Sequence, residues 1–262
     1  MILITIFLIL FIVIYAFKIE PYLIKVKKYN INKKTENKIK IVQISDIHIK
    51  NNFTPNHLNK IIKKINEQNP DIVVFTGDLY DNYNEYNDDE NLIKSLSSIK
   101  SKYKFAVLGN HDYVDSGNKY KEIMKKANFT ILDNSTEKLL FHSKTIYVSG
   151  ISDLICSKPN FELKSNKPYN ILLTHQPEAA TKMKNKFDLI LSGHTHGGQF
   201  IIPYIAIISS KFLKGSHHSL KYTKGFYNKE NQKLYVNSGL GTTRISARLG
   251  SIPEITLFNL YL

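Results

Sequence analysis

The alternation of short apolar segments with amphipathic segments after residue 38 restricts the possible folds more than any other feature. Apolar runs of strand length, closed by glycine or a polar residue, lie at 38–45, 71–77, 103–109, 170–175 and 188–193. Amphipathic segments that predict helices lie at 54–69, 89–100, 117–127 and 177–186. Further strands are expected at 129–133, 138–142, 145–151, 233–239 and 254–262. This order predicts an α/β sandwich of two mixed sheets flanked by helices.

The length and the composition favour one large domain. The chain has 262 residues, of which 42% are hydrophobic, so it can bury a full core. Its formal net charge of +14 favours anionic partners such as phosphorylated substrates or anionic lipids. Neither a basic arm nor zinc-finger spacing is present, so we expect no dedicated nucleic-acid binding. The single cysteine, Cys156, can form no internal disulfide.

The N-terminus has the composition of a membrane segment. Residues 1–17 carry no charged side chain and are just long enough to cross a bilayer. A basic start and a small-residue cleavage site, which are typical of a secretory signal, are missing. We therefore expect an uncleaved anchor at 1–24, a lysine-rich linker at 25–38 and one globular domain at 39–262. The lysines after the anchor favour a cytoplasmic location for that domain.

Polar side chains collect where the predicted strands end. They are Asp46, His48, Asp78, Asn110, His111, Asp112, His175, His194 and His196. Each of them alone could be a helix cap or a turn residue. In α/β folds, however, the carboxyl ends of the strands form the ligand-binding edge. Carboxylates and imidazoles with one amide and no sulfur suit manganese, iron or zinc better than calcium, so the set predicts a metal site.

The order SDIH, GDLYD, GNHD, LLTH and GHTH resembles the calcineurin-like metallophosphoesterase family. The resemblance extends from about Lys40 to Leu262. The segments SGHTHGGQ and NSGLGTTRISARLGSIPEI resemble a bacterial, membrane-associated branch of that family, related to the YkuE and YaeI proteins. The resemblance implies a metal-dependent phosphoric ester hydrolase with the calcineurin-like sandwich fold, which the composition of residues 1–17 extends by an N-terminal transmembrane helix.

The resemblance also assigns roles to individual residues. It implies that Asp46, His48 and His196 hold one divalent cation, that Asn110, His175 and His194 hold a second, and that Asp78 bridges the two. The two cations, manganese, iron or zinc, would activate a bridging hydroxide for in-line attack on phosphorus. His111 matches the general acid that protonates the leaving group.

Three residues near these motifs have more open roles. Asp112 could orient the imidazole of His111 or cap a helix. Asp81 is expected beside the metals but not as a ligand. Arg248 could bind the substrate phosphate or form a structural salt bridge, for example with Glu254.

The substrate expected from this pattern is a membrane-associated or lipid-linked phosphodiester. The alternatives are a pyrophosphatase of the UDP-2,3-diacylglucosamine type, a broad phosphomonoesterase and a non-catalytic membrane-bound binding module. The apolar segment 200–215 follows the last histidine motif. It predicts either a buried strand with its loop or an apolar surface segment that rests in the lipid interface. The segment 80–90 is expected to be an exposed acidic loop.

Overall fold

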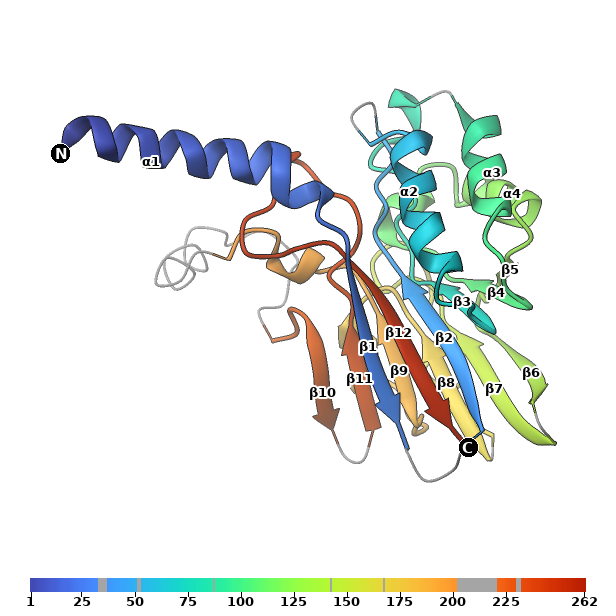
Figure 1. Cartoon of the computed structure of the whole chain (residues 1–262). Coiled ribbons are helices and arrows are strands. Elements are labelled where there is room, and N and C mark those ends of the chain that lie inside the picture. The colour runs from blue at the N-terminus through green and yellow to red at the C-terminus, as the bar shows by residue number, and fades with distance from the viewer. Residues whose placement is uncertain are drawn as a thin grey trace.

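The computed structural model describes residues 1–32, 37–50, 53–86, 88–141, 143–166, 168–201, 221–229 and 232–262. Two six-stranded mixed sheets form a sandwich, and helices cover the outer face of one of them (Figure 1). This arrangement confirms the fold class predicted from the sequence.

The first sheet contains both ends of the globular part of the chain. Its strand order is β1 (Lys25–Ile31), β12 (Glu254–Tyr261), β2 (Lys38–Ile44), β3 (Ile72–Phe75), β4 (Tyr103–Ala106) and β5 (Thr130–Ile131). Strands β2 to β5 are parallel, β12 is antiparallel to β2, and β1 is parallel to β12. The last strand of the chain therefore lies between the first two.

The second sheet is also parallel at its centre. Its order is β10 (Gly225–Lys229), β11 (Gln232–Val236), β9 (Leu189–Ser192), β8 (Tyr169–Leu173), β7 (Lys144–Gly150) and β6 (Ser135–Phe141). Strands β11, β9, β8 and β7 are parallel, and antiparallel strands close both edges. The parallel strands of both sheets deliver their following loops to one end of the sandwich, where the polar motifs lie.

Apolar side chains fill two main layers. Ile41, Val74, Leu191 and Phe258 belong to a core built from both sheets. A second layer packs the other face of the first sheet against α2 (Pro55–Asn66), α3 (Asp89–Ser97) and α4 (Asn118–Lys126). The short helical turns are η3 (Tyr83–Glu85), η4 (Asn110–Tyr113), η5 (Pro177–Thr181) and η6 (His196–Gly198).

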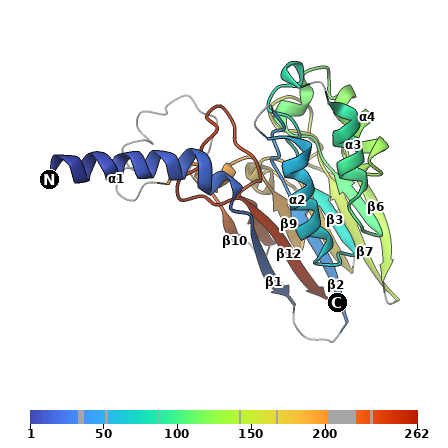
Figure 2. The ribbon, with the colours of Figure 1, turned by 45° about the horizontal axis from the view of Figure 1, so that its top comes forward.

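The N-terminal helix projects away from the sandwich (Figures 1 and 2). α1 (Ile2–Ile14) continues through a π-helical turn, η1 (Tyr15–Ile19), and a 3₁₀ turn, η2 (Glu20–Tyr22). The helix runs over 21 residues from Ile2 to Tyr22 and contains an 18-residue stretch with a mean hydropathy of 2.9, so it is long and apolar enough to cross a membrane.

The base of this helix is bonded to the loop before β12. The carboxylate of Glu20 is buried and accepts hydrogen bonds from the backbone N–H groups of Gly250, at 3.0 Å, and Ser251, at 2.6 Å. The backbone N–H of Arg248 donates to the carbonyl of Ala16 at 2.9 Å. The apolar helix is thus joined to the globular part by specific polar contacts.

The structure corrects three sequence-based expectations. Residues 25–38, expected as a linker, contain the edge strand β1, and lysines are common on edge strands because they discourage further pairing. The helix expected at 177–186 is only the short turn η5, because the N–H of Lys184 bonds to the carbonyl of Phe161 instead of continuing a helix. The segment 80–90 is not simply an exposed loop, since Tyr80, Tyr83 and Tyr86 are buried. Most of the segment 200–215 lies outside the described residues.

Candidate metal centre

The predicted ligands meet at the carboxyl ends of strands from both sheets. Asp46 and His48 follow β2, Asp78 follows β3, and Asn110 and His111 begin η4 after β4. From the second sheet, His175 follows β8, and His194 and His196 follow β9. Strand direction therefore brings together residues that are up to 150 positions apart in the sequence.

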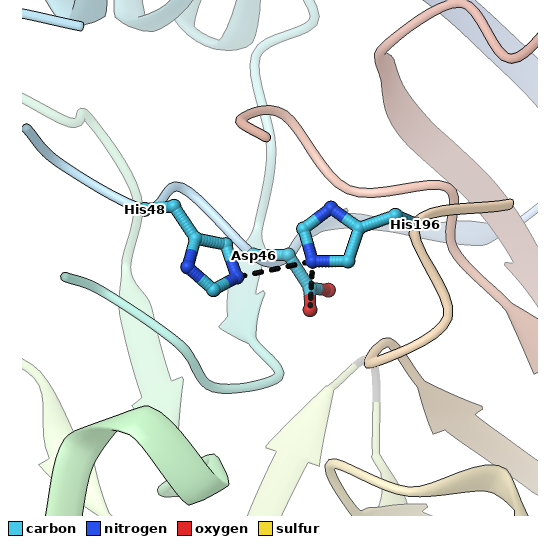
Figure 3. A group of neighbouring side chains, drawn as sticks. All are labelled: Asp46, His48 and His196. Carbon is cyan, nitrogen blue, oxygen red and sulfur yellow. Dashed lines mark hydrogen bonds and ion pairs between the residues drawn. The ribbon is translucent and has the colours of Figure 1, made fainter. Parts of the chain in front are cut away.

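One group consists of Asp46, His48 and His196 (Figure 3). The Nε2 atoms of the two histidines are 3.0 Å apart, and His196 Nε2 is 3.6 Å from Asp46 Oδ1. Two neutral imidazoles at this distance need a proton or a cation between them, because otherwise their nitrogen lone pairs would repel each other. All three side chains are buried.

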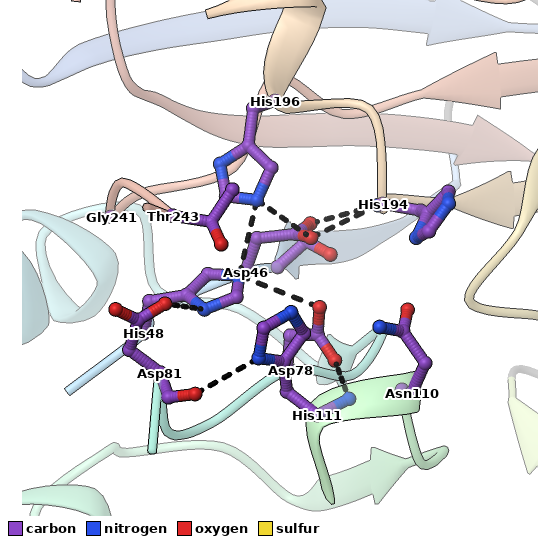
Figure 4. A network of polar contacts seen from close by, with 12 residues as sticks. Asp46, His48, Asp78, Asp81, Asn110, His111, His194, His196, Gly241 and Thr243 are labelled. Atoms are coloured by element: carbon purple, nitrogen blue, oxygen red, sulfur yellow. Dashed lines mark hydrogen bonds and ion pairs between the residues drawn. The ribbon is translucent and has the colours of Figure 1, made fainter. Parts of the chain in front are cut away.

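The second group consists of Asp78, His175 and His194. Asp78 Oδ2 is 3.1 Å from His175 Nε2, and the same oxygen is 3.4 Å from His48 Nε2 in the first group. His175 Nε2 in turn lies 3.1 Å from His194 Nδ1. A single carboxylate oxygen of Asp78 therefore lies within reach of histidines from both groups, and Figure 4 shows its contact with His48.

Asn110 lies beside the second group (Figure 4). Its Oδ1 atom is buried and, among the described residues, has no hydrogen-bond partner. An unpaired buried amide oxygen is costly, and a cation would satisfy it. The donor set of carboxylates, imidazoles and this amide oxygen fits divalent manganese, iron or zinc.

Backbone conformation is unusual at most of these residues. Asp46, His48, Asp78, His194 and His196 all have positive φ values, between 47° and 72°. Few non-glycine residues adopt this left-handed region, and strained conformations concentrate at functional sites. The tips of β2, β3 and β9 are therefore held in conformations that aim the side chains inward at a local energetic cost.

Glycines next to the ligands allow the loops to approach closely. A Cβ atom on Gly109 would lie 2.2 Å from Asp78 Oδ1, and one on Gly193 would lie 2.3 Å from Asp46 Oδ2. Neither position can accept a side chain without displacing a predicted ligand. This explains why GNHD and GHTH each begin with glycine.

Burial and mutual contact set the protonation of the cluster. Burial lowers the pKa of His48 and His175, but contacts with Asp78 more than offset it and raise them to about 9 and about 10. Burial raises the pKa of Asp78, but His175 and His48 hold it well below its usual value. For His196, burial together with the nearby His48 and Arg248 lowers the pKa well below the usual value.

His111 and Asp81 lie together beside His48 (Figure 4). The Nδ1–H of His111 donates to the backbone carbonyl of Asp81 at 2.9 Å, which leaves Nε2 available for another partner. The carboxylate of Asp81 contacts His48 Nδ1 at 3.2 Å and Lys50 Nζ at 3.1 Å. Asp81 thus orients a predicted ligand from outside the group, as the sequence suggested.

Asp112 does not contact the imidazole of His111. Its buried carboxylate accepts hydrogen bonds from the backbone N–H groups of Asp78 at 2.8 Å, Leu79 at 2.9 Å and Gly109 at 2.8 Å. The bond to Gly109 caps the turn η4, so the capping alternative describes this residue better than the orienting one. Asp112 fixes the loops that carry Asp78 and Asn110 relative to each other.

Arg248 is not placed to bind substrate. Its side chain is fully buried and donates to the backbone carbonyls of Gly241, Ser251, Ser238 and His196 at distances of 2.5 to 3.3 Å. It forms no salt bridge with Glu254 within the described part of the chain. The sequence motif around Arg248 suggested that it could bind the substrate phosphate. In the structure its guanidinium instead supports the loop that carries His196.

A pocket of about 140 Å³ opens above the cluster. The predicted site residues Asp78, Asn110, His111, His194 and His196 line it together with Ile155, Thr243 and Arg244. Sequence reasoning missed the last three. Ile155 lies in the loop after β7 and carries no polar group, and nothing in the pattern after β11 distinguishes Arg244 from Arg248. The only available signal was that residues 237–246 follow a strand tip at the same edge.

The comparisons with known proteins agree with this geometry. Residues 39–198 match the family model for calcineurin-like phosphoesterases, and the chain belongs to this family of metal-dependent phosphoester hydrolases. It is 36% identical to the metallophosphoesterase YkuE of Bacillus subtilis, over 94% of this chain and 88% of YkuE. It is 28% identical to YkoQ of the same organism over 89% of both chains.

Two further likenesses concern a membrane protein and a solved structure. A transmembrane protein with a metallophosphoesterase domain from Danio rerio is 30% identical over 84% of this chain and 52% of its own length. The crystal structure of a putative 5′-nucleotidase from Staphylococcus aureus superposes with a TM-score of 0.49 at 13% identity, over 85% of this chain and 54% of that chain.

Proposed function

We propose that the chain is a phosphodiesterase with two divalent cations that acts on a membrane-associated or lipid-linked phosphate. One observation carries the proposal of two cations. Asp78 Oδ2 lies 3.1 Å from His175 and 3.4 Å from His48, so one carboxylate is shared by two groups of potential ligands. When bound, the cations would supply charge neutralisation and a water of lowered pKa at the phosphorus.

The ligand assignment follows from the same contacts. Asp46, His48 and His196 form one site, Asn110, His175 and His194 form the other, and Asp78 belongs to both. The close approach of His48 to His196 and of His175 to His194 supports the pairing. The unpaired Oδ1 of Asn110 supports its place in the second site.

His111 is proposed as the general acid. Its Nδ1–H is held by the carbonyl of Asp81, so a proton on Nε2 can pass to the departing alkoxide. The ring lies 4.8 Å from that of His48 and lines the pocket. His111 also forms a potential ligand group with His48 and Asp78, which places its imidazole beside the proposed cations and the phosphate that they would bind.

The apolar N-terminal helix is proposed as an uncleaved anchor. A cleaved signal would remove Ala16 and Glu20, whose polar atoms bond to the backbone of residues 248–251. The lysines that follow the helix, such as Lys25 and Lys28, favour a cytoplasmic location for the globular part.

A substrate panel with the purified full-length protein tests the proposal. After metal removal and addition of manganese, we expect faster hydrolysis of bis(p-nitrophenyl) phosphate than of p-nitrophenyl phosphate, and faster hydrolysis still of a phosphodiester lipid in vesicles. A preference for the monoester would favour the phosphomonoesterase alternative. Release of a nucleoside monophosphate from a nucleotide-linked lipid would favour the pyrophosphatase. Two bound metals without turnover on any ester would favour a binding module.

A further inference from the structure

The loop between β11 and β12 connects the metal pocket to the base of the apolar helix. On one side, Thr243 and Arg244 line the pocket above the cluster. On the other side, Thr242 and Ser246 border a small recess together with Pro21 and Tyr22 of the turn η2. In both views of the molecule, the red segment after β11 lies against the end of the helix (Figures 1 and 2). Residues 242–246, called the lip below, therefore separate the pocket from the anchor by the width of one loop.

Apolar side chains are exposed around the base of the helix. Ile245 of the lip is 52% exposed, and Ile252 beyond the Glu20 contact is 37% exposed. Phe17, Ile19 and Tyr22 are between 38% and 43% exposed. Phe17, Ile19 and Tyr22 follow directly on α1, whose large hydrophobic residues up to Ile14 are all at least 40% exposed. Exposed apolar side chains next to a helix that can span a membrane are suited to contact the interface of the bilayer.

Arg244 is the charged residue of the lip. It is exposed at the pocket and has a φ of 57°, a strained conformation for a non-glycine residue. Within the described part of the chain its guanidinium forms no hydrogen bond or ion pair, in contrast to the fully engaged Arg248. A guanidinium that has no partner among the described residues, at the mouth of a pocket lined by Asp78, His111 and His194, is suited to bind a phosphate oxygen pair bidentately.

We propose that the lip, residues 242–246, is where the metal pocket meets the bilayer surface: Ile245 enters the lipid interface while Arg244 binds the phosphate of a substrate that enters from that interface. The Arg244 half rests on the proposed phosphoesterase function, whereas the Ile245 half depends only on the anchor. The arrangement gives a lipid-linked phosphate a path to the cluster in which its acyl part stays in the membrane.

Tryptophan fluorescence tests the position of Ile245. The chain contains no tryptophan, so Ile245→Trp introduces a single fluorophore into the full-length protein. In vesicles of phosphatidylcholine and phosphatidylglycerol, brominated acyl chains should quench about half or more of its emission if the residue lies in the interface, within about 10 Å of the acyl boundary. The matched control is Leu140→Trp, at an apolar position on β6 that is somewhat more exposed (62% against 52%) and far from the helix. Equal quenching of the two variants, or none in either, would overturn the proposal.

Phosphate binding tests Arg244 without requiring turnover. Calorimetry of the manganese-loaded protein with inorganic phosphate should show about tenfold weaker binding in Arg244→Ala, or about 1.4 kcal/mol. Arg244→Lys should recover part of the loss, and Lys186→Ala, at the opposite end of β9, should change nothing. In the ester assay, KM should rise by a similar factor while kcat changes little. Unchanged phosphate affinity in Arg244→Ala would remove the arginine from the proposal. If the wild-type protein hydrolyses no ester but the Ile245→Trp variant is quenched as expected, the result counts against the proposed function alone.

Discussion

The buried carboxylate of Glu20 gives a direct test of how tightly the anchor is built into the globular part. Glu20 is 1% exposed and accepts two backbone hydrogen bonds from the loop before β12. In Glu20→Gln one oxygen can still accept a bond, but the new NH₂ group faces a backbone N–H. A hydrogen bond to a charged group contributes about 1.5 to 3 kcal/mol and a neutral one about 1 kcal/mol.

The expected net loss follows from these magnitudes. Two charged bonds contribute about 3 to 6 kcal/mol, the glutamine keeps about 1 kcal/mol, and release of a buried charge returns part of the difference. We therefore expect the free energy of unfolding to fall by about 2 to 3 kcal/mol. For a domain of this size that corresponds to a lower unfolding midpoint by about 5 to 10 °C.

Thermal unfolding of the full-length protein in detergent, followed by circular dichroism, measures this shift. Glu122→Gln is the matched control, because the same chemical change occurs there in an exposed pair with Lys126 whose glutamate side chain is 64% exposed. We expect the control to stay within about 1 °C of the wild type. If Glu20→Gln behaves like the control, the contacts of Glu20 do not hold the helix to the loop, and the argument for an uncleaved anchor loses its basis.

Three further predictions concern the cluster itself. Asp78→Asn should keep the fold but lower both metal content and turnover. Loss of a residue that only hydrogen-bonds to a metal ligand costs roughly 10- to 100-fold, and we expect the loss of turnover here to be larger. Two bound metals with normal turnover would contradict the bridging role. His111→Ala should retain metal and slow hydrolysis of esters with poor leaving groups by about 10²- to 10⁴-fold, but slow that of nitrophenyl esters much less; an equal loss on both would exclude the acid role. His48 and His175, with pKa values raised to about 9 and about 10, are protonated at pH 7.5 in the metal-free protein and must become neutral to bind metal. Calorimetry in buffers of different ionisation enthalpy should therefore detect proton release on manganese binding at pH 7.5 that disappears as the pH rises above 10, and no release at pH 7.5 would show that these histidines are already neutral.

The sequence predicted the elements that carry the site well, because strand tips are marked by local signals. Apolar runs that end in glycine or a polar residue located Asp46, Asp78 and Asn110, and strand direction placed them at one edge. The strand β1 was missed because an edge strand rich in lysine has the composition of a linker. Its pairing depends on β12, which lies more than two hundred positions later in the chain.

The individual roles of Asp112, Arg248 and Arg244 could not be predicted for a different reason. Asp112 lies in the short turn η4 and the two arginines lie in a loop, and their roles depend on which backbone groups are brought near them. Arg248 is occupied by carbonyls of the residues around it, whereas Arg244, four positions earlier, is left at the pocket. Local sequence does not encode this difference, since both arginines follow the same strand tip.

The position of β12 between β1 and β2 also governs the order in which the protein can be completed during synthesis. β1 and β2 leave the ribosome early, soon after the apolar helix, but neither can pair on its β12 side until residues 254–261 have been made. Throughout translation the nascent chain therefore presents open strand edges close to the membrane, and such edges can pair with other chains. Because non-local pairing is slow, closing the first sheet is expected to be the late step of folding. Early capture of the apolar helix by the bilayer would hold these open edges at the membrane surface during that interval.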